Sequence, residues 1–152
     1  NELSISPEND AASVKRYFTS VWQVYEKTFL TLKEDDLSIL QNALSKNDLS
    51  QLEKLTSIID AIDAAISGIK KIPVPEGYEN FAVKEINYLI RGRRMVEIIK
   101  GAKEDPLSAL GVLSARIKLS EDLKIFHQET GAQLREKGIS FKPNDGAYRL
   151  FQ

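Results

Sequence analysis

The chain has 152 residues, of which 42% are hydrophobic and 28% are charged, and its formal net charge is −1. This length favours a single domain, predicted over residues 1–152, with enough apolar surface to bury a core without disulfides. The near-neutral charge is spread evenly along the chain, so it gives no support for binding to nucleic acid or to an anionic membrane surface. The absence of cysteine excludes disulfide bonds and thiol catalysis.

The first predicted helix carries an apolar residue at every third or fourth position, a spacing typical of a helix that packs against a neighbour. This apolar stripe consists of Ala11, Val14, Phe18, Val21, Tyr25, Phe29 and Leu32. Upstream, Ser6-Pro7-Glu8 provides a capping hydroxyl, a proline suited to a first turn, and an acidic side chain for the positive helix end. We therefore predict that the helix begins at these residues.

A short helix and a long helix follow the first one. The pattern predicts the short helix over about 36–46, with an apolar face of Leu37, Leu40 and Leu44. We expect the long helix over about 48–70, with Asn47 as its cap. Its apolar stripe consists of Leu49, Leu52, Thr56, Ile59, Ile62, Ile66 and Ile69. A single bent helix through both segments is the competing interpretation.

Prolines mark the remaining boundaries. Ile72-Pro73-Val74-Pro75 is the clearest break, because each proline removes a backbone donor and favours extended geometry before it. A third long helix is predicted over about 76–102. Asp105-Pro106 then begins a fourth over about 106–137, and Gly138 is its expected left-handed cap. The stripe predicted for the fourth helix consists of Leu107, Leu110, Leu113, Ile117, Leu123, Phe126 and Leu134.

Four long helices joined by short links predict an all-α antiparallel bundle with one short extra helix, no strand and an irregular C-terminal tail. The tail, residues 139–152, is unusually apolar, and four of its residues give it this character: Phe141, Tyr148, Leu150 and Phe151. We predict that it folds back along the bundle as a strap. The alternative is an interaction peptide in which Tyr148 and Phe151 contact a partner.

Two groups of residues on the helices are candidates for binding. Trp22 and Tyr25 belong to an aromatic concentration on the first helix, where core packing is the favoured interpretation and a ligand or partner face is the alternative. Arg91 and Arg94 share one face of the third helix, and Arg93 points elsewhere. Arginine suits anion recognition, but ion pairs with neighbouring helices are favoured, and Glu97 lies three residues after Arg94.

No pattern of catalytic or metal-binding residues emerges. Asp60 and Asp63 lie three residues apart on a predicted helix, but a di-iron bundle would also need Glu-x-x-His pairs. His127 is the only histidine, and no nucleophile is placed relative to it by a motif. The sequence therefore predicts no catalytic residue, no metal and no cofactor.

The connection between the second and third long helices resembles a feature of helical bacterial lipoproteins of unknown function. The stretch is Ile69-Lys70-Lys71-Ile72-Pro73-Val74-Pro75-Glu76-Gly77-Tyr78, followed by an amphipathic helix to Ala102 and another after Asp105. The resemblance implies an exported protein, associated with the cell envelope through a lipid-bearing N-terminal cysteine before Asn1. The first residue is not methionine, which is compatible with that expectation.

The sequence thus predicts a non-enzymatic interaction module, exported and membrane-tethered, that contacts an unknown protein or small ligand. No nucleic-acid partner is expected, and the membrane would be reached only through an anchor outside this chain. Two alternatives remain open. One is a cytoplasmic adaptor or regulatory domain, and the other is a small-molecule sensor with a pocket between helices, lined by Trp22 and Tyr25.

Overall fold

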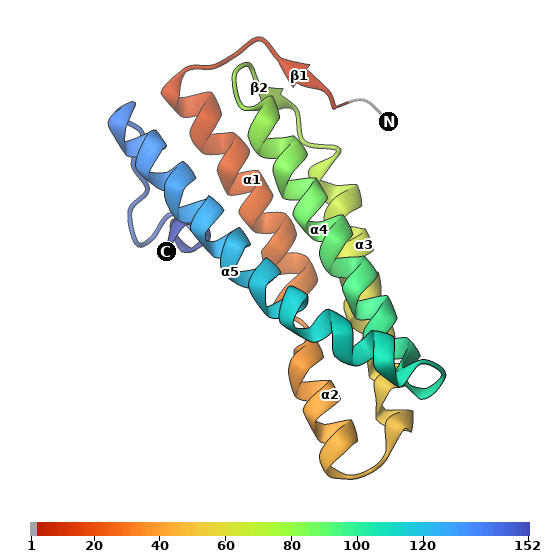
Figure 1. Ribbon diagram of the computed structural model, residues 1–152. Coiled ribbons are helices and arrows are strands. Elements are labelled where there is room, and N and C mark those ends of the chain that lie inside the picture. Colours follow the sequence, from red (N-terminus) through yellow and green to blue (C-terminus); the bar gives the residue numbers. More distant parts are fainter. Residues whose placement is uncertain (1–2) are drawn as a thin grey trace.

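The computed structural model describes residues 3–152, and four long helices account for most of them (Figure 1). They are α1 (Ala11–Phe29), α3 (Leu55–Ile69), α4 (Glu79–Lys100) and α5 (Pro106–Glu136). Each of these helices runs opposite to the one before it, so they form an antiparallel bundle (Figure 1). The prediction of an all-α antiparallel bundle is confirmed.

Shorter elements connect the long helices. The predicted short helix is α2 (Asp36–Ser45), and the segment after it begins as a 3₁₀ helix, η1 (Leu49–Lys54), before α3. A second 3₁₀ turn, η2 (Gly101–Lys103), separates α4 from α5. The tail, predicted to be irregular, contains a third 3₁₀ helix, η3 (Gly146–Phe151).

The start of α1 differs from the prediction. Asp10 is the cap, and its carboxylate accepts the backbone N–H groups of Ala12 and Ser13 at 2.8 and 3.0 Å. Ser6 instead belongs to β1 (Ile5–Ser6), which pairs in parallel with β2 (Val74–Pro75). The prediction of no strand was therefore wrong, because the extended backbone that Pro73 and Pro75 favour offers hydrogen-bonding groups to the N-terminal segment.

Residues in left-handed backbone conformation end two helices. Asn47, with a φ of 48°, terminates α2, so it is not the cap of the next helix as predicted. Asp48 takes that role, since its carboxylate accepts the Ser50 N–H at 3.1 Å. Gly138, with a φ of 75°, follows α5 as predicted.

The four long helices do not close into a complete ring. α1 packs on α3, α3 on α4, and α4 on α5, but the last and first helices meet mainly through the tail, because η3 contacts both α1 and α5. We call the gap between these two helices the α1–α5 seam. What fills this seam changes along its length.

At one end of the seam the filling is aromatic. The Phe18 ring of α1 is fully buried and makes edge-to-face contacts with Phe81 of α4 and with Phe141 and Phe151 of the tail. The Phe18–Phe151 ring centroids are 5.1 Å apart. We call this region the sealed end. Aromatic pairs in this geometry stabilise a core beyond the burial of their area.

The apolar face predicted for the first half of α5 is wrong at three of its four positions, with Leu113 as the exception. Leu107 is 82% exposed, Leu110 60% and Ile117 49%, whereas Ala109 and Leu119 are buried. The prediction assumed that the largest apolar residues face a neighbour. Here α5 has no neighbour on that side among the described residues, and Val112 and Leu113 pack, partly buried, against the core instead.

Most residues predicted for the apolar faces of α2, η1 and α3 are buried or half-buried, among them Leu40, Leu52 and Ile62, but two predicted positions are wrong. Leu44 and Thr56 are exposed, while the adjacent Ala43 and Leu55 are buried.

Candidate functional site

The other end of the α1–α5 seam holds a chamber of about 810 Å³. It lies between the C-terminal part of α1, the segment 30–38, and the middle parts of α3, α4 and α5. Arg149 and Leu150 of η3 border it on the side of the tail. The chamber therefore occupies the length of the seam that the aromatic side chains of the tail do not reach.

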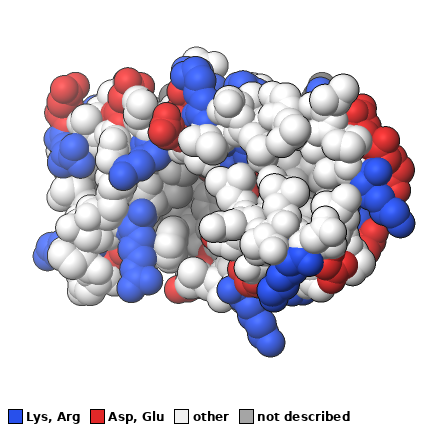
Figure 2. Space-filling view, turned by 60° about the horizontal axis from the view of Figure 1, so that its bottom comes forward, with Lys and Arg blue, Asp and Glu red and all other residues white. Residues whose placement is uncertain are grey.

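Most of the chamber wall is apolar. Phe29 and Leu32 line it from α1 and the loop that follows, Ile62 from α3, Leu89 from α4, and Leu123 from α5. A space-filling view shows a hollow among uncharged atoms, with side chains of both charges around it (Figure 2). Protein interiors are normally packed as densely as organic crystals, so a space of this size is not what folding alone requires.

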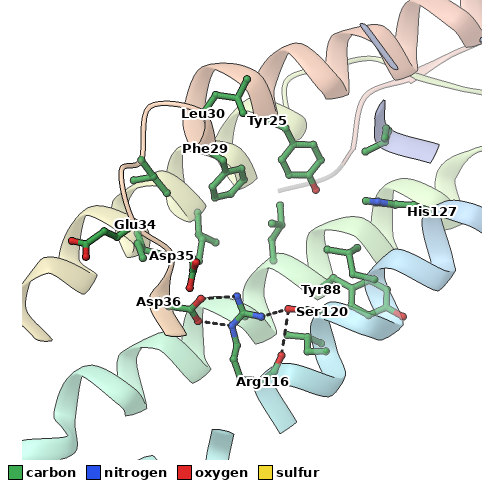
Figure 3. Close-up of a pocket in the computed structure, with 18 of the residues that line it drawn as sticks. Tyr25, Phe29, Leu30, Glu34, Asp35, Asp36, Tyr88, Arg116, Ser120 and His127 are labelled. Atoms are coloured by element: carbon green, nitrogen blue, oxygen red, sulfur yellow. Dashed lines mark hydrogen bonds and ion pairs between the residues drawn. The ribbon is translucent and has the colours of Figure 1, made fainter. Parts of the chain in front are cut away.

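A buried polar cluster lies beside the chamber. The Glu85 side chain has no solvent exposure, and its carboxylate accepts a hydrogen bond from the Tyr25 hydroxyl. Its other oxygen lies 2.8 Å from Nε2 of His127, whose side chain is only 12% exposed. Tyr25 and His127 both line the chamber, and they reach toward the same space from α1 and α5 (Figure 3). Glu85 thus links three helices of the bundle.

The environment of Glu85 perturbs two tyrosines. Burial, and secondarily the charge of Glu85, raise the pKa of Tyr25 well above its usual range, so this hydroxyl stays protonated and donates. The same two causes raise the pKa of Tyr17. The Tyr17 hydroxyl is buried and has no hydrogen-bond partner among the described residues. An unpaired buried hydroxyl costs about 1–3 kcal/mol, so the core beside Glu85 is not fully satisfied.

A second polar group lies on the opposite side of the chamber. Arg116 of α5 donates two hydrogen bonds to Asp36 of α2. Its Nε lies 2.7 Å from Oδ2, and its Nη2 lies 3.1 Å from Oδ1. Its remaining nitrogen donates to the Ser120 hydroxyl (Figure 3). The side chains of Arg116 and Asp36 are 19% and 5% exposed, so this is a mostly buried, bidentate ion pair. It fastens the segment 30–38 to α5.

The structure brings together only part of the predicted site. Trp22 and Tyr25 line the chamber, as expected for the alternative in which a pocket between helices binds a small molecule. Phe151 is buried at the sealed end, and Tyr148 is half-buried on the tail and lines no cavity with the chamber residues. These two tail residues therefore do not belong to the chamber.

The predicted arginine surface is separate from the chamber. Arg91 and Arg94 are exposed, and Arg91 lines a shallow groove between α4 and α5 together with Asp122 and Glu129. The expected pairing of Arg94 with Glu97 is wrong. Arg93 takes that partner at 2.7 Å and also binds Asp63 of α3 at 2.6 Å, because residues four apart stack on one helix face.

The described residues contain neither a cluster of metal ligands nor a membrane-spanning helix. Over residues 3–152, no three His, Asp or Glu side chains gather in a way that could hold a metal ion. Asp60 is exposed, and Asp63 is engaged with Arg93. In the same range, no helix combines the length and the hydropathy needed to span a membrane.

Sequence reasoning missed Glu85, Asp36 and Arg116. A signal for Glu85 was available, because it lies three residues after Ala82 and four before Leu89, within the apolar stripe of α4. A charged residue at such a position is almost never buried unless it is paired. The pairing of Asp36 with Arg116 joins residues 80 positions apart, and no local pattern indicates it.

Comparison of the chain with known protein families, with characterised proteins and with solved structures gave no match.

Proposed function

We propose that this protein binds a small molecule with a largely apolar body in the chamber of the α1–α5 seam. The observation that carries the proposal is the chamber itself, about 810 Å³ in volume, with mostly apolar walls and two buried polar groups. Ligand sites commonly have volumes of roughly 300–1,000 Å³ and this composition. The proposal corresponds to the small-molecule alternative predicted from the sequence.

The polar groups have a specific part in this proposal. Glu85 holds Tyr25 and His127, and Asp36 holds Arg116, so the polar side chains at the wall have fixed positions before a ligand arrives. A preorganised wall reduces the ordering that binding requires. The apolar wall would supply affinity, and the fixed polar groups would orient the ligand.

The proposed role is binding without a chemical step. We retain from the sequence the proposal that the module acts outside the cytoplasm and is membrane-tethered, with a cytoplasmic adaptor as the alternative. Reading the coding sequence upstream of Asn1 tests this location. A signal sequence that ends in a lipid-attachment cysteine would support it, whereas a cytosolic reading frame that starts at the first helix would contradict it.

A neutral apolar fluorophore tests binding in the chamber. We expect N-phenylnaphthylamine to become brighter on addition of the protein and to quench Trp22, the only tryptophan, which lines the chamber. Gly92→Phe should weaken dye binding by about tenfold or more, because the new ring would enter the chamber from α4, where only Leu119 lies near, at 3.7 Å.

The matched control is Gly111→Phe, which places the same ring on the exposed surface of α5, with no atom within 4 Å of the added Cβ. It should bind the dye as the parent protein does. Circular dichroism and thermal melting establish that each variant is folded. Leu123→Trp, which narrows the chamber from α5, serves as a second blocking variant. The proposal fails if the parent protein does not bind the dye, or if folded blocking variants bind it unchanged.

A further inference from the structure

A smaller cavity of about 240 Å³ adjoins the chamber, between α5 and the tail. It shares five residues with the chamber, among them Ser120, His127 and Arg149, and it adds Lys124 and Gln152. Because the shared residues line both spaces, the two lie side by side, a wide apolar part and a narrow part at the tail, and we call them together the recess. We call the narrow part the vestibule.

The vestibule has a cationic wall. Lys124 and His127 lie one turn apart on α5, and Arg149 faces them from η3. No Asp or Glu side chain lines the vestibule, and neither Lys124 nor Arg149 forms an ion pair with a side chain in the described part of the chain. Two cationic side chains that form no ion pair in the described part of the chain thus converge beside His127, whose Nε2 already lies 2.8 Å from the buried Glu85 carboxylate.

The carboxylates of the chamber lie near the beginning of α2, and each is already engaged. Glu34 accepts from Asn42 at 2.9 Å, Asp35 accepts from the Ser38 N–H at 2.8 Å, and Asp36 holds Arg116. Glu34 also pairs with Lys54 at 3.4 Å, whereas the hydrogen bond to Asp35 comes from a neutral donor and leaves the charge of this carboxylate in place. Lys33, which also lines the chamber there, has no ion pair among the described residues. Lys33, Lys124 and Arg149 are therefore the cations of the recess that pair with no carboxylate among the described residues.

Burial of the tail fixes the vestibule in place. Leu150 and Phe151 are buried, and Phe151 lies so close to α5 that a Cβ on Gly131 would be 2.9 Å from its Cβ. Arg149 is adjacent to these residues, so its backbone is held beside α5. The tail therefore contributes a charged residue to the recess as well as an apolar seal.

We propose that the natural ligand is an amphipathic anion, with its apolar body in the chamber and its anionic head group in the vestibule against Lys124 and Arg149. This inference rests on the proposed function and names the chemical class of its ligand. Charge-assisted hydrogen bonds are stronger than neutral ones, so the head group would add both affinity and orientation.

Three ten-carbon compounds with different head groups test the inference: decanoate, decanol and decylammonium. Binding is followed by Trp22 fluorescence and by displacement of N-phenylnaphthylamine. We expect decanoate to bind about tenfold more tightly than decanol, and decylammonium to bind most weakly. Higher ionic strength should reduce the affinity for decanoate and leave that for decanol unchanged.

The double variant Lys124→Ala/Arg149→Ala should bind decanoate about tenfold more weakly and decanol unchanged. Its control is Lys46→Ala/Arg135→Ala, which removes the same two charge types from exposed positions outside the recess, after α2 and in the last turn of α5. This control should keep the preference for decanoate. Both variants should melt near the parent temperature.

The outcomes separate the two proposals. If the dye binds in the chamber but decanol or decylammonium binds as tightly as decanoate, the anionic ligand is rejected and the binding function stands. The anionic ligand is also rejected if the preference for decanoate survives in Lys124→Ala/Arg149→Ala. If neither the dye nor any ten-carbon compound binds, both proposals are rejected.

Discussion

The two ends of the α1–α5 seam are built from the same two helices but are filled in different ways. At the sealed end, the tail inserts Phe141 and Phe151 against Phe18, and the rings pack edge to face or tilted on one another. At the chamber end, no segment of residues 3–152 is inserted and about 810 Å³ stays open, with Glu85 and Arg116 engaged beside it. The sealed end is a packed core, and the chamber end has the features of a ligand-binding site.

This difference shows how a bundle can combine stability with an opening. A seam that is packed along its whole length would be more stable but would admit no ligand, and one open along its whole length would expose the core. The tail closes only part of the seam, and its Arg149 and Leu150 form the border between the two parts. The stability of the sealed end therefore supports the chamber next to it.

The largest expected effect is at the sealed end. Phe151→Ala should lower the free energy of unfolding by about 3–5 kcal/mol, because a buried ring is lost and a cavity remains between α1 and α5. Urea denaturation followed by circular dichroism measures this. Leu107→Ala is the control, since Leu107 is 82% exposed and the change should stay within about 0.5 kcal/mol. Equal losses in the two variants would contradict the comparison of the two ends.

Two glycine-to-alanine changes should have opposite signs at the two ends. Gly131→Ala places a Cβ 2.9 Å from the Phe151 Cβ, an atom that cannot swing away, so a net loss of about 1 kcal/mol is expected. Gly92→Ala meets only Leu119 at 3.7 Å beside the chamber, so the higher helix propensity of alanine should stabilise the fold by about 0.5–1 kcal/mol. Chemical denaturation of both variants measures the two changes in the free energy of unfolding. A lower stability of Gly92→Ala would show that the chamber wall is tightly packed and would contradict the prediction.

The smallest expected effect is the same at both ends. The Ser13 N–H lowers the pKa of Asp10, which begins α1 at the sealed end, and the Ser108 hydroxyl and N–H lower that of Asp105, which begins α5 at the other end. A carboxylate with a lowered folded-state pKa stabilises the fold above its unfolded pKa, about 3.9 for Asp. This stability is lost as the pH falls through the folded-state value.

Asp10→Asn and Asp105→Asn keep a capping oxygen but remove the titration. The stability difference between each variant and the parent should therefore shrink as the pH is lowered below about 4. Melting temperatures across that range measure it. If the melting temperatures of both variants depend on pH in the same way, the two ends of the seam differ in packing and not in the electrostatics of their caps. If only one variant shows this pH dependence, cap electrostatics also contribute to the difference between the ends.

The sequence was a good guide to the elements and a poor one to the space between them. Helical spacing and Asp-Pro chemistry located α4 and α5 to within a few residues, because caps and periodicity are local. The errors on the first half of α5 and at Thr56 arose because size and spacing do not tell which side meets a neighbour. Leu107 and Thr56 occupied predicted core positions, yet both are exposed.

Part of the candidate site could also be predicted from the sequence. Trp22 and Tyr25 were named as the lining of a pocket, and they line one. Glu85 could have been found as a charge within an apolar stripe. The pairing of Asp36 with Arg116 and the convergence of Lys124 with Arg149 could not, since each joins elements whose proximity depends on the whole fold.

The contact between Phe18 and Phe151 also has a consequence for the order of folding during synthesis. The two residues are neighbours in the core but lie near opposite ends of the sequence. A ribosome makes the chain from its N-terminus, and distant contacts form late because long loops must close first. The aromatic surface of α1 must therefore wait, uncovered, until Phe151 has emerged, and during this interval a chaperone that recognises exposed aromatic side chains would find α1.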